Sequence, residues 1–325
     1  MLEIRGKLSA QNLIELQALR KLPALKLIRI SAAPTQGIPD YSWDFLTEIT
    51  TLESLSLLTE TLTARKLPKL IDTDKLANLP NLTILRLNNK YDNSNSSLNK
   101  LKNLTVFDCS GIYGDQDSFT QAVNAGALTK LIEIKTVSDL QLESPLPHLR
   151  KVTIPLESNF LQNTARHYPK LTDATLNATL LSSEYVAKMN AINALKYVNN
   201  LTIIAYDYKI KSAPQLVSLQ AFTELQNLRL YGITSHSGDF SILPPLKELY
   251  VYLDSFQETI SLKNLQSYEV LFLSGSSLVN LQKAPKSKIK KFFTNGNIKY
   301  KGLENINGIK YRRHLFMERL KTPYK

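Results

Sequence analysis

The side chains best suited to catalysis are few and stand far apart in this sequence. The four histidines, His148, His167, His236 and His314, lack the close spacing of metal ligands. The single cysteine, Cys109, falls within an apolar pattern, where a buried thiol is inert. The sequence contains neither a glycine-rich phosphate loop nor a Gly-x-Ser-x-Gly nucleophile motif. We therefore predict no catalytic residue, no metal site and no cofactor, and we expect a protein that is not an enzyme.

Positive charge is a second possible source of chemistry, and it is concentrated at the C-terminal end. Of the net charge of +12, residues 283–325 carry thirteen Lys or Arg and two acids, which gives +11. This basic patch includes Lys288, Lys290, Lys291, Arg312 and Arg313. Such a patch binds phosphate-rich surfaces by releasing counterions, and it also steers an acidic protein toward an adjoining site. The solvated face of a terminal cap is a third interpretation.

An internal repeat defines the elements that position these residues. Leu79-x-x-Leu82-x-x-Leu85-x-Leu87 is the template, and twelve segments follow it. The second template position falls at residues 25, 52, 82, 104, 131, 149, 171, 201, 225, 246, 268 and 289, with a mean spacing of 24 residues. The eighth segment aligns as Val198, Leu201, Ile204 and Tyr206. In each segment the final Leu-x-Leu predicts a short strand with both side chains on one face, because side chains alternate along a strand.

Stacking of these strands predicts a parallel sheet over a continuous apolar core. A set of amphipathic helices is the alternative, but polar, Gly, Asn or Asp residues follow each Leu-x-Leu. Long repeats contain helix-like stretches at 118–127 and 182–195, whereas repeats of 21–22 residues leave room for a 3₁₀ turn. Ser9 is a helix N-cap signal, so residues 9–21 predict a capping helix.

With twelve template segments in register, the chain resembles leucine-rich-repeat proteins of an irregular, bacterial or intracellular type. The resemblance implies an α/β fold, a leucine-rich-repeat solenoid with a concave parallel sheet and a convex side of mixed helical, 3₁₀ and turn segments. We expect one domain over residues 1–325, with 1–21 as N-terminal cap, 22–297 as repeats and 298–325 as basic C-terminal cap. The family places an Asn ladder three residues after the last strand Leu, and here only Asn297 fills such a position. Either the register shifts locally or the turns are stabilised in another way.

The residues between the template leucines are expected on the concave face, away from the core. Repeats nine to twelve place aromatic and basic side chains there: Arg229, Tyr231, Tyr250, Tyr252, Phe272 and Phe293. Adjacent strands lie about 4.8 Å apart, so these rings would form one stripe. An exposed aromatic stripe of this kind marks a binding surface. Two alternatives remain: a register shift that makes Phe272 or Phe293 core, and coverage by the C-terminal segment.

These features predict a non-catalytic protein-binding module whose concave face recognises a protein partner, aided by the basic C-terminal end. We expect the partner to carry an acidic patch and the chain to be a monomer. The alternative is an electrostatic binder of nucleic acid or anionic membrane through residues 283–325. A catalytic site assembled from concave acids and Lys135 has the least support.

Cysteine usage and apolar run length bear on location. One cysteine excludes an internal disulfide, and no apolar run is long enough to span a bilayer. We expect a cytoplasmic protein, or an effector delivered into a host cell; immunity and scaffold roles fit as well. Four of the five Asn-x-Ser/Thr sequons, at Asn81, Asn103, Asn177 and Asn200, lie inside the repeat pattern. We interpret them as parts of the repeat and not as glycan sites.

Overall fold

A computed structural model of the chain gives two compact units, which we call unit 1 (Met1–Leu171) and unit 2 (Thr172–Lys325). The structure describes residues 1–22, 24–34, 43–58, 71, 73–87, 97–109, 117–137, 139–156, 158–162, 166–178, 195–205, 219, 222–232, 243–252, 269–274, 290–295 and 312–313.

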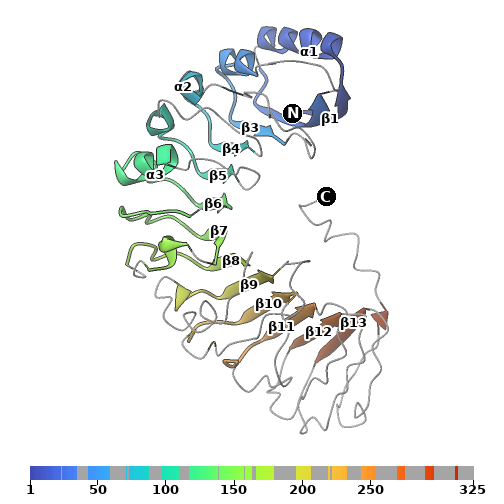
Figure 1. Cartoon of the computed structure of the whole chain (residues 1–325), viewed down its shortest axis with the longest axis vertical. Coiled ribbons are helices and arrows are strands. Elements are labelled where there is room, and N and C mark those ends of the chain that lie inside the picture. The colour runs from blue at the N-terminus through green and yellow to red at the C-terminus, as the bar shows by residue number, and fades with distance from the viewer. Residues whose placement is uncertain are drawn as a thin grey trace. The chain divides into compact units, whose positions relative to one another are not determined.

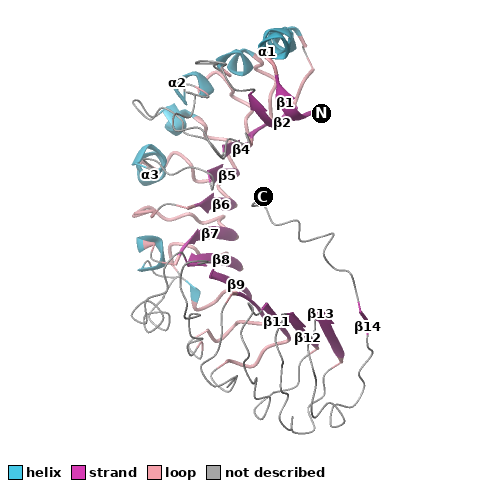
Figure 2. Ribbon diagram, turned by 45° about the vertical axis from the view of Figure 1, so that its right-hand side comes forward, coloured by secondary structure: helices cyan, strands magenta, loops and turns pink. Residues whose placement is uncertain are grey.

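Unit 1 is built on parallel strands that lie side by side in chain order. The strands are β1 (Leu2–Leu8), β2 (Leu27–Pro34), β3 (Ser54–Leu57), β4 (Ile84–Leu87), β5 (Val106–Cys109), β6 (Glu133–Thr136) and β7 (Lys151–Pro155). The helical segments are α1 (Ala10–Leu16), η1 (Gln17–Lys21), η2 (Asp44–Glu48), α2 (Thr73–Leu76), η3 (Ser97–Lys100), α3 (Asp117–Asn124) and η4 (Asn159–Gln162). These helices occupy the return segments, on the side away from the strands (Figures 1 and 2).

Unit 2 repeats the same arrangement of parallel strands in chain order. Its strands are β8 (Asp173–Ala178), β9 (Asn200–Ala205), β10 (Asn227–Tyr231), β11 (Glu248–Tyr252), β12 (Val270–Ser274), β13 (Lys291–Asn295) and β14 (Arg312–Arg313). The helix-like stretch expected at 182–195 lies outside the described residues except for Leu195.

The Leu-x-Leu prediction is confirmed, because each of the twelve repeats supplies one strand, from β2 to β13. The template side chains form the core: Leu52, Leu55 and Leu57 of one repeat are fully buried, and so is Thr136, which takes a leucine position. Aromatic rings complete the packing between a strand and its return segment. Phe107 of β5 stacks on Phe119 of α3 at 4.2 Å between ring centroids.

Three of the described return segments agree with the expectation from repeat length. The repeats of 22 residues contain η3 and η4, which are single 3₁₀ turns, while a repeat of 27 residues accommodates α3. Gly126, with φ of 72°, turns the chain after α3 in the left-handed conformation that glycine adopts without steric cost. The helix expected over 9–21 is present as α1 and η1, and the Ser9 side chain accepts from Asn12 N and closes a capping box.

Strand β1 was not expected from the sequence. It pairs with β2 along its whole length and places Leu2 and Ile4 beside the core residues Ile28 and Ile30. The signal was present in Leu2-x-Ile4, which is a lone Leu-x-Leu without the preceding template leucines. The N-terminal cap therefore consists of a strand followed by a helix.

Neighbouring turns of unit 1 are linked by threonines that lie just before the strands. Thr83 Oγ1 donates to Glu53 O at 3.0 Å, and Thr105 Oγ1 donates to Thr83 O at 3.0 Å. The amides of Asn81 and Asn103 donate to the carbonyls of Thr50 and Pro80 in the preceding turn. The Asn-Leu-Thr sequons thus link neighbouring turns, which supports their interpretation as parts of the repeat.

The alignment of the eighth repeat predicted from the sequence was wrong by three residues. In β9 the core residues are Leu201 and Ile203, which pair with Ala174 and Leu176 of β8, so Ile204 points outward. The template there is Leu195, Val198, Leu201 and Ile203, and the spacings around it become 27 and 27 residues in place of 30 and 24. The error arose because consecutive apolar residues, Ile203 and Ile204, fit either alignment.

Candidate protein-binding surface

The strand register of unit 2 brings the predicted aromatic residues together on the outer face of its sheet, the face that does not carry the template leucines. Arg229 pairs with Tyr250, Tyr250 with Phe272, and Phe272 with Phe293 along one row across β10 to β13. Tyr231 pairs with Tyr252 in the next row. Phe292 aligns with the core residue Leu271, which leaves Phe293 on the outer face. The expected stripe is therefore present, and Phe293 is not a core residue.

The side chains of this stripe contact one another, and we call Arg229, Tyr231, Tyr250, Tyr252 and Phe272 the aromatic cluster. The Tyr231 and Tyr252 rings stack at 4.2 Å with an interplanar angle of 9°. Phe272 lies 5.0 Å from Tyr252 and 5.9 Å from Tyr250, in tilted geometry. The Arg229 guanidinium lies over the Tyr250 ring, 5.1 Å from its centroid, a cation–π contact. One connected surface of rings and guanidinium thus covers three strands.

The exposure of the cluster differs from the expected one at Phe272. Its ring is on the outer face, but only 9% of its surface is exposed, because large aromatic side chains on the neighbouring strand pack against it. Tyr231, Tyr250 and Tyr252 are half-buried, and Arg229 is exposed. The accessible part of the cluster is therefore the three tyrosines and the arginine, and Phe272 packs against the tyrosine rings.

Burial also affects the ionisation of the cluster. Burial, together with the nearby Tyr231 hydroxyl, raises the pKa of Tyr252 well above its usual value. Burial and the Glu248 carboxylate raise the pKa of Tyr250, whose hydroxyl donates to Glu248 Oε2 at 3.3 Å. Both phenols are therefore neutral near neutral pH and can donate hydrogen bonds. The positive charge of the cluster comes from Arg229 alone.

The basic patch lies only partly within the described residues. Lys291 is exposed, and Lys290 donates to Glu269 Oε1 at 3.1 Å, which lowers the pKa of Glu269. Arg312 and Arg313 form β14, and Arg312 is in register with Phe293. The row of Phe272 and Phe293 therefore lies between arginine positions at 229 and 312. Lys288 lies outside the described residues.

A polar ladder on the same face was missed by the sequence analysis. Asn227 Nδ2 donates to Asn200 Oδ1 at 2.5 Å, and Asn200 Nδ2 donates to Asp173 Oδ1 at 2.9 Å. These three residues take the same position in successive strands, beside the aromatic cluster. The corrected eighth repeat would have identified it, since it aligns Asn200 with Asn227. The ladder fixes the strand ends that present Arg229.

The residues suited to catalysis are not assembled into a site within the described part of the chain. Cys109 is fully buried, with its Sγ 3.5 Å from the carbonyl of Lys135, as its template position predicts. His148 and His167 are in unit 1, where Lys170 Nζ lies 3.4 Å from His148 Nδ1, while His236 and His314 fall outside the described residues. No group of three or more His, Cys, Asp or Glu that could bind a metal occurs among the described residues. None of the described helices has the length and apolar character needed to cross a membrane.

The sheet, its inward leucines and its variable return segments define the fold as a leucine-rich-repeat solenoid. No family model matches the sequence, and no curated protein matches it. Among solved structures, the chain is similar to a leucine-rich-repeat protein of Leptospira interrogans, with 15% identity, a TM-score of 0.44, and coverage of 91% of this chain and 80% of the other. It is also similar to an internalin, InlF, of Listeria monocytogenes, with 15% identity, a TM-score of 0.39, and coverage of 91% and 83%. For the functional domain of InlJ from the same organism, which includes a cysteine ladder, the identity is 13%, the TM-score 0.37 and the coverage 90% and 69%.

Proposed function

We propose that this chain is a non-catalytic binding module and that the outer face of unit 2 docks a protein partner. The observation that carries the proposal is the aromatic cluster, in which three half-buried tyrosines and an exposed arginine form one connected surface. Tyrosine and arginine are the side chains most enriched at the centres of protein interfaces. Each tyrosine provides a large contact area at a small cost in side-chain entropy, because its neighbours already hold the ring in place.

The chemistry of the surface favours an acidic partner. Arg229 and Lys291 are exposed cations on the described part of this face. The tyrosine hydroxyls are neutral and can donate hydrogen bonds to carboxylates. An acidic patch on the partner would be steered by these charges and would then pack apolar side chains against the rings. We propose that Arg312 and Arg313, and Lys288, extend this basic border.

Truncation of two of the half-buried tyrosines tests the proposal. The test uses the full chain as bait in lysate of the source organism, with bound proteins identified by mass spectrometry. A partner that binds wild type should be lost or weakened at least about tenfold in the Tyr231→Ala, Tyr250→Ala double variant. Phe272 is left intact, because truncating a ring that is only 9% exposed would create a cavity.

Tyr197→Ala is the matched control. This tyrosine is in unit 2 and 58% exposed, but it precedes β9 and is not part of the aromatic cluster. A partner that is retained by the control and lost by the double variant, with unchanged circular dichroism, supports the docking surface. Equal binding by wild type and double variant contradicts it.

A second comparison separates protein recognition from simple charge attraction. The variant Lys291→Glu is applied to immobilised heparin and to vesicles with anionic headgroups, each over a range of salt concentrations. If the chain binds nucleic acid or membrane through its basic end, retention should fall steeply with salt and with this substitution, and the tyrosine variant should behave as wild type. That pattern, in the absence of a protein partner, would replace the proposal by the electrostatic alternative.

A further inference from the structure

The outer face of unit 1 carries a polar row that the docking surface in unit 2 does not involve. In the central position of successive strands, β1 to β6 place Glu3, Arg29, Ser56, Arg86, Asp108 and Lys135. Ser56 therefore lies between two arginines, one on each neighbouring strand. Since strands are about 4.8 Å apart, the Cα atoms of Arg29 and Arg86 are separated by about 9.6 Å, with the serine midway between them.

Ser56 has an unusual environment for a residue on this face. It is only 4% exposed, and its hydroxyl has no hydrogen-bond partner among the described residues. Buried polar atoms nearly always have a partner, so the Ser56 hydroxyl keeps a donor and an acceptor that a bound group can use.

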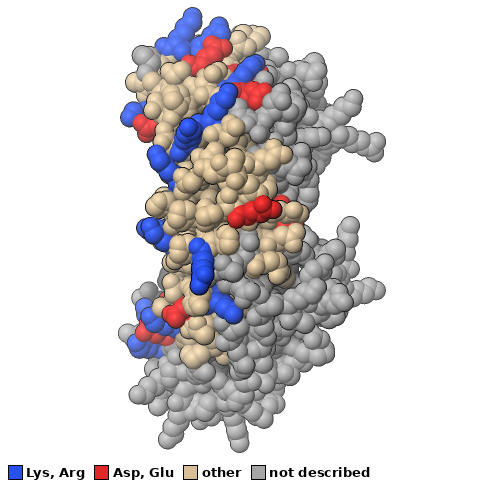
Figure 3. Space-filling model, turned by 90° about the vertical axis from the view of Figure 1, so that its left-hand side faces the viewer, with Lys and Arg blue, Asp and Glu red and all other residues tan. Residues whose placement is uncertain are grey.

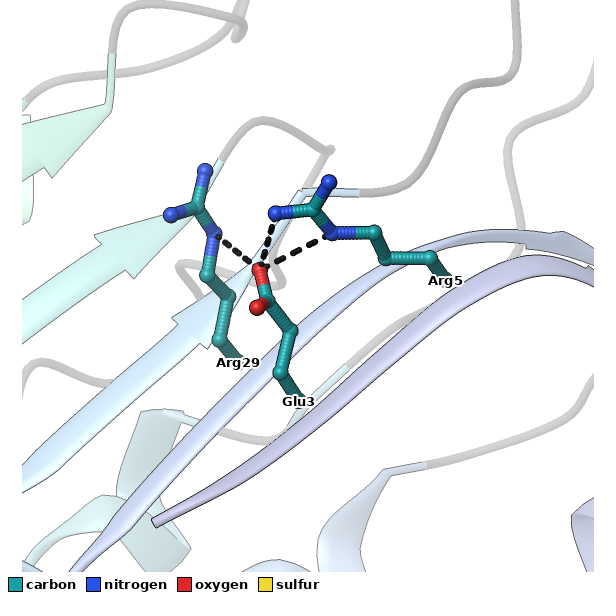
Figure 4. Close-up of polar contacts among 3 residues, drawn as sticks. All are labelled: Glu3, Arg5 and Arg29. Atoms are coloured by element: carbon teal, nitrogen blue, oxygen red, sulfur yellow. Dashed lines mark hydrogen bonds and ion pairs between the residues drawn. The ribbon is translucent and has the colours of Figure 1, made fainter.

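The acidic residues nearby are already committed to other cations. Glu3 Oε1 accepts from Arg5 Nε at 3.1 Å and Nη2 at 2.9 Å, and it also lies 3.5 Å from Arg29 Nε (Figure 4). The two terminal nitrogens of Arg29 point away from Glu3 (Figure 4). Glu3 thus orients Arg29 through one nitrogen and leaves the two other nitrogens of its guanidinium for another acceptor.

Arg86 is not neutralised by the acid on the adjacent strand. Asp108 pairs with Arg86 in the strand register, but its carboxylate lies 3.6 Å from Lys135 Nζ, and no ion pair to Arg86 is formed within the described residues. The row carries three cations, Arg29, Arg86 and Lys135, and two carboxylates, Glu3 and Asp108, so its net charge is +1.

We propose that Arg29, Ser56 and Arg86 form a binding site for a phosphate group on the outer face of unit 1. Guanidinium groups bind phosphate through paired hydrogen bonds in a planar fork, and two of them flank the position where the anion would sit. The phosphate would accept from both arginines and from the Ser56 hydroxyl, which then gains the missing partner. A phosphate has enough oxygens to accept from both guanidinium groups and from the hydroxyl at once, whereas a carboxylate offers only two oxygens.

Binding requires the arginine side chains to shift. These side chains are long, and the side chain of Arg29 is half exposed, so they can swing outward and fold over an arriving anion. The site is independent of the aromatic cluster, because each residue that forms it belongs to unit 1. Its success or failure therefore does not decide the proposed function.

Phosphate titration at constant ionic strength tests the site. Chloride is replaced stepwise by inorganic phosphate in one series and by acetate in a second series. Binding is followed by titration calorimetry and by the shift in Tm. We expect phosphate, but not acetate, to raise the Tm of wild type. We expect Arg86→Gln to weaken the affinity for phosphate at least about tenfold. Arg86→Lys keeps the charge but loses the fork, so an intermediate affinity is expected. Ser56→Ala should also weaken the affinity for phosphate. It should not lower the stability of the free protein, because the Ser56 hydroxyl makes no hydrogen bond in that state.

Arg166→Gln is the matched control, since Arg166 is exposed in a turn of unit 1 and not on the sheet. If this control and Arg86→Gln lose phosphate binding equally, binding is due to general positive charge. If neither loses it, phosphate binds without Arg86. Either outcome refutes the proposal. No phosphate binding by wild type refutes it as well. A peptide with one phosphoserine and uncharged flanks identifies the source of the group: tighter binding than free phosphate assigns the site to a phosphorylated chain, and equal binding assigns it to the free ion.

Discussion

Two adjacent isoleucines in β9 provide a sharp test of the corrected register. Ile203 is 2% exposed and lies between the core residues Leu176 and Leu230 of the flanking strands, whereas Ile204 is half-buried on the outer face. Ile203→Ala deletes three buried carbons, which is about 2.4 kcal/mol at roughly 0.8 kcal/mol per methylene. A cavity adds to this, so the expected loss lies within about 2–5 kcal/mol. Ile204→Ala opens no cavity, and its expected cost is about 1 kcal/mol or less.

Urea unfolding followed by circular dichroism measures both losses. Each variant is compared with wild type at an unchanged m-value, so that a lower midpoint reports a lower free energy of unfolding. The two substitutions remove the same three side-chain carbons from adjacent residues, so each variant serves as the control for the other. A larger loss for Ile204→Ala than for Ile203→Ala would restore the original alignment of the eighth repeat and refute the strand register described for β9.

Three further predictions concern other parts of the chain. Thr105→Val leaves the Thr83 carbonyl without its hydroxyl donor and should lower the free energy of unfolding by about 1 kcal/mol, measured by urea unfolding. Ser9→Ala removes the capping-box acceptor and should cost about 1 kcal/mol in the same assay, whereas no change would contradict the cap. The pKa of Tyr252 is raised above 10.0, so its contribution to stability is complete below about pH 10 and is lost as pH rises through the raised value. Tyr250 is also raised, so phenolate absorbance should show one fewer late-ionising tyrosine in Tyr252→Phe than in wild type; identical titration curves would contradict the burial of this ring.

The sequence could predict the strands because their signal is repeated. A single Leu-x-x-Leu-x-x-Leu-x-Leu is ambiguous, but twelve of them place one strand per repeat and fix which residue of each strand faces the core. Where the repetition fails, the prediction fails with it. Strand β1 has the Leu-x-Leu without the leading leucines, and in β9 the pair Ile203 and Ile204 satisfies two alignments.

The residues of the candidate surface could be predicted, but their exposure could not. Alternation along a strand places Phe272 and Tyr250 on the outer face from sequence alone. How deeply each ring is buried depends on the side chains on the adjacent strands, since Phe272 is covered by tyrosine rings that lie about twenty residues away in sequence. The same limit applies to Ser56, whose isolation arises from neighbours on β2 and β4 and not from its own segment.

The alternation that builds this fold also separates stability from recognition. Core leucines and outer side chains occupy successive positions of the same strand, so the outer row can change without disturbing the stacked interior. Units 1 and 2 illustrate this: at the same strand position one carries Arg29, Ser56 and Arg86, and the other carries Arg229, Tyr250 and Phe272. A substitution of a partly exposed member of either row should therefore alter binding and cost less free energy of unfolding than Ile203→Ala. If Tyr250→Ala or Arg86→Gln lowered the free energy of unfolding by as much as Ile203→Ala, the outer rows would be part of the structural core, and both binding proposals would lose their physical basis.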